Sequence, residues 1–347
     1  MVDKKVYSSP NFVNKKPLIS FVLAGRNDNY GGDFRLRLQR SISSLFKQLN
    51  TFKIDSEIIF VNYNPLTDSE ISNFIAWPKS NKFITVKIIT VAPELHEQFV
   101  KNNDVKNVPV LEYPAKNAGI RRAKGSYILS MNPDIIFDDK FFKDIPRLKK
   151  ENYYRCNRFD FKLENKNLPS DNIISYAKKH ISKIWVKAIS KEIKVGSFSR
   201  YKFYLILLQQ KMEIYSLTFS FLSKLNLDPK AEYKFHCNVS GDFMLMHNDN
   251  WQQLKAYKEN SFLALHVDAL MVVQAATLGL KEQVFSYPIY HQEHTRRYDA
   301  DKENRDFRDA YLIFQNDAQR MIKEKKPMLF NNQNWGFENS ELEEILL

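Results

Sequence analysis

The sequence has little cysteine and no long apolar run. Its two cysteines, Cys156 and Cys237, form neither a disulfide framework nor a zinc-ligand spacing, so we expect a reducing compartment. No run of about 18 apolar residues occurs, which argues against a transmembrane helix. Residues 1–17 are polar and lack the apolar core of a signal peptide, and they predict a flexible leader. We therefore expect a cytoplasmic protein without a signal peptide.

The composition favours a globular protein with anionic partners. Of the 347 residues, 44% are hydrophobic and 14% aromatic, enough for a sizeable core in more than one and fewer than three average domains. The net charge of +12 points to phosphates, nucleic acid or an anionic membrane surface. An AT-rich genome, which favours Lys and Asn, explains the same charge without any partner.

Strand-like and helix-like segments alternate through the first 140 residues. Short β-branched runs alternate with segments of helical apolar spacing, which predicts a mostly parallel sheet with helices on both faces. The expected strands are 18–24, 57–63, 83–91 and 127–131, and the expected helices are 33–49, 68–76 and 115–123. The later part predicts strands at 152–161, 242–247 and 283–287 and helices at 266–278 and 304–325.

The stretch from Tyr113 to Asp139 carries the most chemistry. A cationic helix leads into an apolar strand, and Pro133 must end that strand because it has no N–H for a sheet ladder. Asp134 is thereby left at the strand's carboxyl edge, where open α/β sheets bind ligands. The polar segments 26–28 and 62–64 follow other strands and should converge on the same edge. A carboxylate beside cations at that edge suits a divalent metal and a phosphorylated ligand.

Residues 165–235 differ in character and are expected to form a basic helical insertion. They carry twelve Lys and one Arg against two Asp and three Glu, so most of the excess charge lies here. Within 173–194, apolar residues fall on one face, and lysines at a spacing of four fall on another. The segment 173–225 has three readings: a lid over an acceptor site, a peripheral membrane contact, or an oligomer contact or ordinary core.

Several segments in order resemble family-2-like glycosyltransferases of the GT-A fold. They are the strand leading to Arg26-Asn27-Asp28, the Lys-Asn-Ala-Gly helix at 116–119, Asn-Pro-Asp at 132–134, Ser-Gly-Asp-Phe at 240–243, His-Val-Asp at 266–268 and His-x-x-His at 291–294. The resemblance covers roughly 18–161 and 235–300, with a weaker echo at 334–336. It implies a Rossmann-like α/β fold of GT-A type.

The resemblance also implies that different parts of the chain have different functions. Residues 18–161 would bind the nucleotide sugar, 236–300 would form the acceptor and catalytic half of the same domain, and 301–347 would form a C-terminal helix and tail. The implied activity moves a sugar from a UDP- or GDP-sugar to an acceptor hydroxyl with inversion. The acceptor, whether glycan, protein or lipid-linked, is left open.

Roles for individual residues follow from the same resemblance. Asp28 and Asn62 would hold the nucleotide base and ribose. The remaining expected contacts to the nucleotide sugar are Arg26, Lys116, Asn117, Arg121 and Asn132. For Arg26, pairing with a neighbouring acid is an equal alternative, and for the others the alternative is a capped loop or a solvated helix start.

The expected metal site departs from the family pattern. Such enzymes usually carry Asp-x-Asp at this strand end, but the first position here is Asn132, which leaves Asp134 alone. His291 or His294 would complete the shell around Mn²⁺ or Mg²⁺, and imidazole suits Mn²⁺ better. The alternative is a metal-independent site in which Lys116, Arg121 or Arg122 neutralises the diphosphate.

The acceptor side centres on Asp268. In the enzymes that this sequence resembles, a carboxylate at such a helix start takes the acceptor proton, which implies the same role for Asp268. An ordinary acid at a helix N-terminus is the alternative. His266 would orient Asp268 or contact the acceptor, and Asp242 would hold sugar hydroxyls.

Two other function classes compete with this interpretation. A sugar nucleotidyltransferase also uses a nucleotide-binding α/β sheet, but it normally has a glycine-rich basic loop after the first strand. A non-enzymatic membrane- or nucleic-acid-binding protein would explain the charge. Nucleic acid is the weaker partner, because the charge is concentrated in the insertion.

Overall fold

The computed structural model describes most of the chain between Lys16 and Leu347. The described ranges are 16–66, 70–103, 105–163, 172–186, 189–194, 235–261, 264–295 and 305–347. Nearly all of the expected leader and most of the expected insertion lie outside these ranges. Among the described helices, none combines the length and the apolar character needed to cross a membrane.

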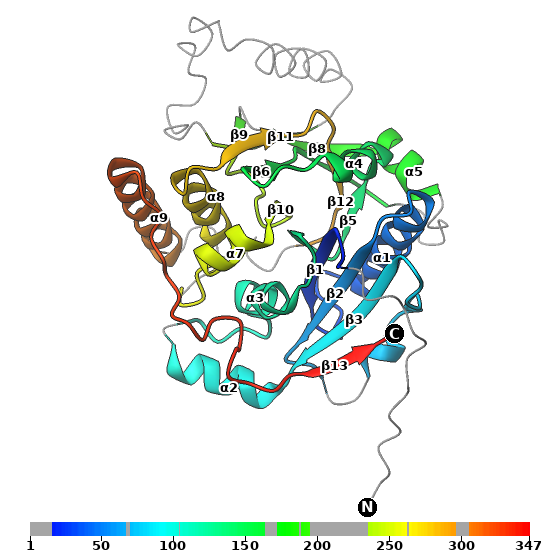
Figure 1. The fold of residues 1–347 in the computed structure, drawn as a ribbon, viewed down its shortest axis with the longest axis horizontal. Helices are drawn as coiled ribbons and strands as arrows, with labels where there is room; N and C mark the ends of the chain where they lie inside the picture. The colour runs from blue at the N-terminus through cyan, green and yellow to red at the C-terminus, as the bar shows by residue number, and fades with distance from the viewer. Residues whose placement is uncertain are drawn as a thin grey trace, which may run out of the picture.

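An eight-stranded sheet forms the centre of the molecule, in the order β11-β6-β10-β4-β1-β2-β3-β13. The strands β3, β2, β1 and β4 run parallel, whereas β10 lies antiparallel between β4 and β6. Figure 1 shows this sheet with helices around it. The strand bounds are β1 Ile19–Gly25, β2 Ser56–Tyr63, β3 Ile84–Val91, β4 Tyr127–Met131, β6 Asn152–Arg155, β10 Phe243–His247, β11 Lys281–Val284 and β13 Glu343–Leu346.

Helices cover both faces of this sheet, as the sequence predicts. Along β1, Phe21 packs in a core with α1 and α4, whereas Val22 packs in a second core with α3, α7 and α8. The alternation follows from the two-residue period of a strand. The helices are α1 Phe34–Thr51, α2 Pro93–Asn102, α3 Glu112–Arg122, α4 Asp139–Asp144, α5 Ile173–Lys179, α7 Asn248–Leu254, α8 Val267–Thr277 and α9 Arg305–Glu324, with short 3-10 turns at Ile71–Asn73 and Ile145–Arg147.

A second sheet of five strands stands beside the first, in the order β5-β12-β7-β8-β9. Its strands are β5 Ile135–Phe137, β7 Arg158–Phe161, β8 Ile181–Val186, β9 Ile189–Lys194 and β12 Ile289–Gln292. The sequence predicts one strand over 152–161, but the chain changes sheets there. β6 belongs to the large sheet and β7 to the small one, with only Cys156 and Asn157 between them.

The expected helix over 173–194 is wrong beyond its first part. Residues 173–179 form α5, but 181–186 and 189–194 form the antiparallel strands β8 and β9. A spacing of four is also a multiple of the two-residue strand period, so the lysine pattern did not distinguish helix from strand. The hydrophobic Ile184 is buried against β7 and α5 in the core of the small sheet.

Three other differences concern the ends of elements. The expected helix over 68–76 is only the 3-10 turn Ile71–Asn73 among the described residues. The strand expected at 283–287 lies earlier, at Lys281–Val284. Near the C-terminal end of the chain, β13 pairs antiparallel with β3 and forms one edge of the large sheet.

Candidate functional site

A cavity of about 630 Å³ opens at the carboxyl ends of β1 and β4. These strands are parallel neighbours, so the polar residues that follow them meet at one edge of the sheet. The cavity is lined by seven residues expected from the sequence to form the site: Arg26, Asp28, Asn132, Asp134, Asp242, His291 and His294. The second sheet contributes His291 from β12 and Arg158 from β7, so the cavity lies between the two sheets.

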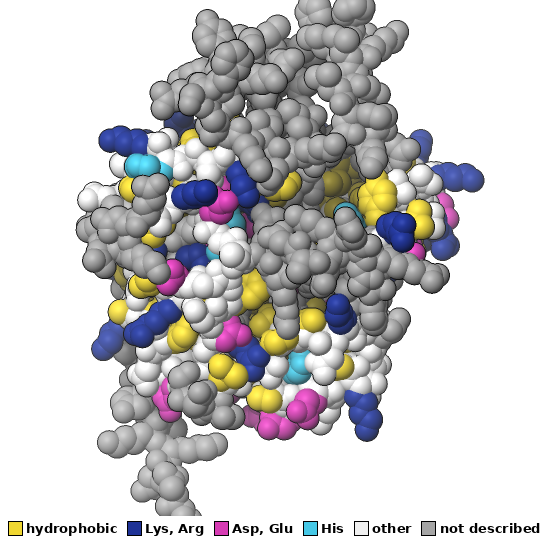
Figure 2. Space-filling model, turned by 180° about the vertical axis from the view of Figure 1, so that it is seen from behind, with side chains coloured by type: hydrophobic (Ala, Val, Ile, Leu, Met, Phe, Trp, Pro, Cys, Tyr) yellow, Lys and Arg dark blue, Asp and Glu magenta, His cyan; other side chains and the backbone are white. Residues whose placement is uncertain are grey.

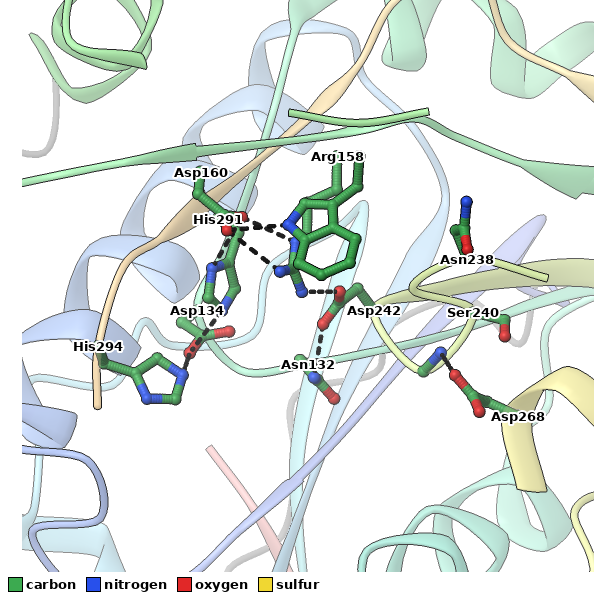
Figure 3. Close-up of polar contacts among 12 residues, drawn as sticks. Asn132, Asp134, Arg158, Asp160, Asn238, Ser240, Asp242, Asp268, His291 and His294 are labelled. Carbon is green, nitrogen blue, oxygen red and sulfur yellow. Dashed lines mark hydrogen bonds and ion pairs between the residues drawn. The ribbon is translucent and has the colours of Figure 1, made fainter. Parts of the chain in front are cut away.

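Asp134 and the two expected histidines come together in this cavity. Asp134 Oδ2 lies 3.2 Å from His294 Nε2 and 3.6 Å from His291 Nε2. Figure 3 shows both imidazole rings turned towards the carboxylate. The same oxygen accepts a 2.6 Å hydrogen bond from Arg37 of α1. Burial alone would raise the pKa of Asp134, but the histidines and Arg37 outweigh burial and hold the pKa well below its usual value.

The three groups have the donor set and the spacing of a divalent metal site. Their ligand atoms all lie within 4.8 Å of one another. Oxygen and nitrogen ligands about 2.1 Å from a shared ion are about 3–4 Å apart, close to the distances seen here. Within the described part of the chain, no hydrogen-bond donor reaches the buried Asp134 Oδ1, which leaves that oxygen free to act as a ligand. One carboxylate and two imidazoles are the kinds of ligand that Mn²⁺ accepts.

A carboxylate also supports His291 from behind. His291 Nδ1 lies 3.2 Å from Asp160 Oδ1, while its other ring nitrogen faces Asp134. This carboxylate–histidine arrangement is common behind metal-binding imidazoles, because it fixes the ring's orientation and tautomer. Asp160 also accepts a 3.1 Å hydrogen bond from Trp185 of β8. Burial would raise the pKa of Asp160, but His291 and Arg158 outweigh burial and lower it.

Arg158 links the two sheets within the site. Its guanidinium pairs with Asp160 at 2.8 Å and with Asp242 at 2.5 Å, and all three side chains are buried. Burial lowers the pKa of Arg158, but the two carboxylates outweigh burial and raise it. Asp242 in turn accepts a 2.6 Å hydrogen bond from Asn132 Nδ2. Figure 3 shows this chain of contacts running from Asp160 to Asn132.

Lys116, on α3, donates hydrogen bonds to residues at the site. Its side chain is almost completely buried, and its ammonium donates to Glu112 Oε1 at 2.7 Å, Asn132 Oδ1 at 2.7 Å and the Gly241 carbonyl at 2.8 Å. Lys116 is not among the residues that line the cavity, but Glu112 and Asn132 are. Its role in the structure is therefore to position two residues of the cavity wall.

Asp268 lies beside Gly241, at the start of α8. Its Oδ2 accepts a 2.7 Å hydrogen bond from Gly241 N, and its Oδ1 accepts from Ala269 N at 2.9 Å. A β-carbon built on Gly241 would lie 3.5 Å from Asp268 Oδ2 and 3.4 Å from Glu112 Oε1, so the two carboxylates flank this glycine. Glu112 lines the cavity, whereas Asp268 is not among the lining residues.

Besides Lys116 and Asp268, four more expected site residues are not among those that line the cavity. Asn62 is buried at the end of β2, level with Gly25 of β1. The Asn117 amide is fully buried and bonds to both backbone groups of Tyr257, which holds the chain after α7. Arg121 pairs with Glu338 and lies over the Trp335 ring. His266 stacks on Phe314 of α9, and burial lowers its pKa although Asp268 opposes this. The contacts that the structure shows for Asn117 and Arg121 are with other parts of the chain, and their expected contact with the nucleotide sugar stays a prediction.

Four residues of the site were not expected from the sequence: Arg37, Glu112, Arg158 and Asp160. The signal for Arg158 and Asp160 lies in their alternation with Phe159 and Phe161, which puts both charges on one face of a strand. Arg37 follows Phe34 by three positions and precedes Leu38 by one, so it falls on the buried stripe of its helix. A charged residue on such a stripe needs a buried partner, which here is Asp134.

Comparison with known proteins gives structural matches but no sequence match. No protein-family model matches the chain, and no curated protein matches it. Among solved structures, the crystal structure of S. aureus TarS 1–349 is similar to it, with a TM-score of 0.44 and 12% sequence identity. The match covers 92% of this chain and 72% of that chain. The side chains of the site therefore carry the functional inference.

Proposed function

We propose that this protein is a glycosyltransferase of the GT-A type, similar to family 2. It would transfer a sugar from a UDP- or GDP-sugar to an acceptor hydroxyl, with inversion and with the help of Mn²⁺ or Mg²⁺. The observation that carries this proposal is the cluster of Asp134, His291 and His294 at the carboxyl end of β4, inside the large cavity. Such a cluster beside a parallel sheet edge suits a nucleoside diphosphate bound through a metal.

The cavity divides naturally between the parts of such a donor. Asp134, His291 and His294 would hold the ion, which neutralises the departing diphosphate when bound. Asp28, which follows β1 and lines the cavity, would contact the base or ribose, and Arg26 beside it would reach a phosphate or stay paired with Asp28. Asp242 and Arg158 also line the cavity, and their polar atoms suit the hydroxyls of the transferred sugar.

The acceptor chemistry needs a base on the opposite side of the sugar. The acceptor oxygen would form its bond to the anomeric carbon as the bond to the phosphate oxygen breaks. The electron pair leaves with the diphosphate, and the hydroxyl proton passes to a carboxylate. Asp268 is the proposed base, and Glu112, across Gly241, is the neighbour that would otherwise serve.

The surface gives little support to the nucleic-acid alternative. On the described part of the face seen in Figure 2, Lys and Arg side chains are scattered, with acidic side chains among them. Nucleic-acid grooves instead gather basic residues in a continuous stripe. A cytoplasmic location and a peripheral membrane contact through 173–225 remain part of the proposal.

A nucleotide screen tests the proposal directly. UDP, GDP, CDP and dTDP are each added to the protein with and without Mn²⁺, and the melting temperature is measured. We expect UDP or GDP to stabilise the protein, more strongly with Mn²⁺. Asp134→Ala should lose the Mn²⁺-dependent part and all nucleotide-sugar turnover.

The matched control is Asp249→Ala, which removes an exposed carboxylate paired with Lys150. It should behave like the wild type. No stabilisation by any nucleotide would overturn the proposed function. Turnover that is unchanged in Asp134→Ala would overturn the metal assignment.

A further inference from the structure

Arg37 occupies the carboxylate that the proposed function assigns to a metal ion. Its guanidinium NH1 lies 2.6 Å from Asp134 Oδ2, and both side chains are about 95% buried. A buried ion pair of this kind is held by the surrounding structure and is little screened by salt. Arg37 is therefore a permanent part of the site.

The paired oxygen is the one that both histidines face. Asp134 Oδ2 lies 3.2 Å from His294 Nε2 and 3.6 Å from His291 Nε2, so an ion between these groups would meet Arg37. The next carboxylate, Asp160, is itself paired with Arg158. With Arg37 present, Asp134 is already neutralised, and Arg158 is shared by Asp160 and Asp242, so the buried network keeps a net charge of only −1. A free divalent cation would therefore bring an uncompensated positive charge into a buried place.

Arg37 also connects the metal ligands to the glycine loop after β1. Its Nε donates to the Gly32 carbonyl at 3.3 Å, and its NH2 donates to the Tyr30 carbonyl. Tyr30 and Gly31 line the cavity. On the other side of the loop, Thr295 Oγ1 donates to the Gly31 carbonyl at 3.1 Å. Loop, arginine and ligands thus form one connected unit.

We infer that Arg37 makes this site select a complex of divalent cation and nucleoside diphosphate over the free cation. This inference rests on the proposed function. The diphosphate brings the negative charge that balances both the ion and Arg37, so each ligand raises the affinity of the other by the same factor. Arg37 is a positioning residue here, because it acts through Asp134 and the loop.

Calorimetric titration with Mn²⁺ tests the inference on the full chain. Mn²⁺ affinity is measured alone and with saturating UDP or GDP, for the wild type, Arg37→Gln and Arg37→Lys. We expect the nucleotide to tighten Mn²⁺ binding to the wild type at least about tenfold, a modest allosteric coupling. Arg37→Gln should bind Mn²⁺ alone at least about tenfold more tightly and show a smaller nucleotide effect.

Two variants separate charge from folding. Arg37→Lys keeps the charge and should retain weak binding of Mn²⁺ alone, which keeps the inference testable if Arg37→Gln does not fold. Arg320→Gln removes an exposed arginine that pairs with Glu324 on α9, and it should match the wild type. Circular dichroism and melting temperatures establish that each variant is folded.

Three results would overturn the inference, and they separate it from the proposed function. If Arg37→Gln binds Mn²⁺ as weakly as the wild type while nucleotide still binds, only the role of Arg37 fails. If Arg37→Lys binds Mn²⁺ alone as tightly as Arg37→Gln is expected to, the charge explanation fails. If no nucleotide binds to any variant, the proposed function fails as well.

Discussion

Single residues in this site act through more than one partner. Gly241 is the clearest example, because its carbonyl accepts from Lys116 and its N–H donates to Asp268. Both carboxylates, Glu112 and Asp268, also lie within ordinary contact distance of a β-carbon built at this position. Two carboxylates thus flank one backbone position, and their roles can be separated by substitution.

Asp268→Asn and Glu112→Gln should differ in their effect on catalysis. Asparagine can still accept from Gly241 N but cannot take a proton, so we expect kcat to fall about 10²–10⁴-fold. Glu112→Gln should lower kcat less than about tenfold. Release of nucleoside diphosphate, followed at saturating donor, measures both. A large loss in Glu112→Gln with a small loss in Asp268→Asn would reverse the assignment.

Glu259 should make stability depend on pH. Burial raises its pKa from 4.5 to about 7, although hydrogen bonds from Asn117 and Gly336 act in the opposite direction. The folded state therefore binds the proton more tightly, so stability falls as pH rises from about 4.5 to about 7. Glu259→Gln keeps the acceptor oxygen without the charge. It should be more stable than the wild type by roughly 1–3 kcal/mol at pH 8, with no difference near pH 4.5.

Urea unfolding of both proteins at the two pH values measures this difference. A variant less stable than the wild type at pH 8 would contradict the raised pKa. The same experiment on Glu338→Gln is a useful control, because Glu338 is largely exposed and its pKa is lowered by Arg121.

The sequence indicated site residues best where polar or charged side chains lie at the ends of predicted strands. Asp134, His291 and His294 were expected to meet although more than 150 positions separate them, and they line one cavity. Arg37 and Arg158 could not be expected in the same way. Their partners lie on other strands, and only the full topology brings those partners within reach.

At the scale of elements, the C-terminal segment fastens α3 to the sheet. Arg122 of α3 donates to the carbonyls of Gly336 and Phe337, and β13 then pairs with β3. Trp335 is buried in the core beneath these contacts. β13 thereby becomes the edge of the sheet, and its exposed Glu343 and Glu344 disfavour unwanted pairing there.

Trp335→Ala should destabilise the whole domain. Removing this buried side chain leaves a cavity and frees Arg121, which lies over the ring, so we expect a loss of about 3–5 kcal/mol. Trp335→Phe keeps an aromatic ring and should cost less. Chemical denaturation measures both. A loss below about 1 kcal/mol for Trp335→Ala would show that the segment is only loosely attached.

Segments whose pattern fits only one kind of element were predicted well, and segments whose pattern fits both a helix and a strand were not. The segment near 33–49 has apolar residues at helical spacing and forms α1, whereas the segment near 266–278 is a longer apolar run that forms the almost entirely buried α8. The segment 181–194 satisfies both periods, and its pairing with β7 decides in favour of strands. Strand β13 is mostly exposed, so it carries no clear apolar pattern.

At the scale of the whole molecule, the chain passes from one sheet to the other, and a network of buried ion pairs connects the two sheets. The alternation of strands and helices predicted the large sheet, because neighbouring elements in the sequence pack together there. The small sheet combines strands from 135–137, 158–161, 181–194 and 289–292. Such distant pairings leave no local signal, so this sheet could not be predicted.

Arg158→Met should weaken the ion-pair connection between the two sheets. It leaves Asp160 and Asp242 buried without their shared cation, which costs about 3–5 kcal/mol when one partner of a buried pair is removed. Urea unfolding measures the loss. Arg147→Met, which breaks an exposed pair with Asp144, should change stability by less than about 1 kcal/mol. Equal losses of stability in the two variants would contradict the proposal that the ion pairs of Arg158 connect the two sheets.

The two-residue period of β7 has a practical consequence for protein engineering. Arg158 and Asp160 face the cavity network, whereas Phe159 and Phe161 pack into the core of the small sheet. A mutant library at positions 158 and 160 would therefore sample new polar groups at the site on an unchanged hydrophobic support, provided that each variant keeps the charge balance with Asp242. Varying 159 and 161 would instead change the packing of the small sheet.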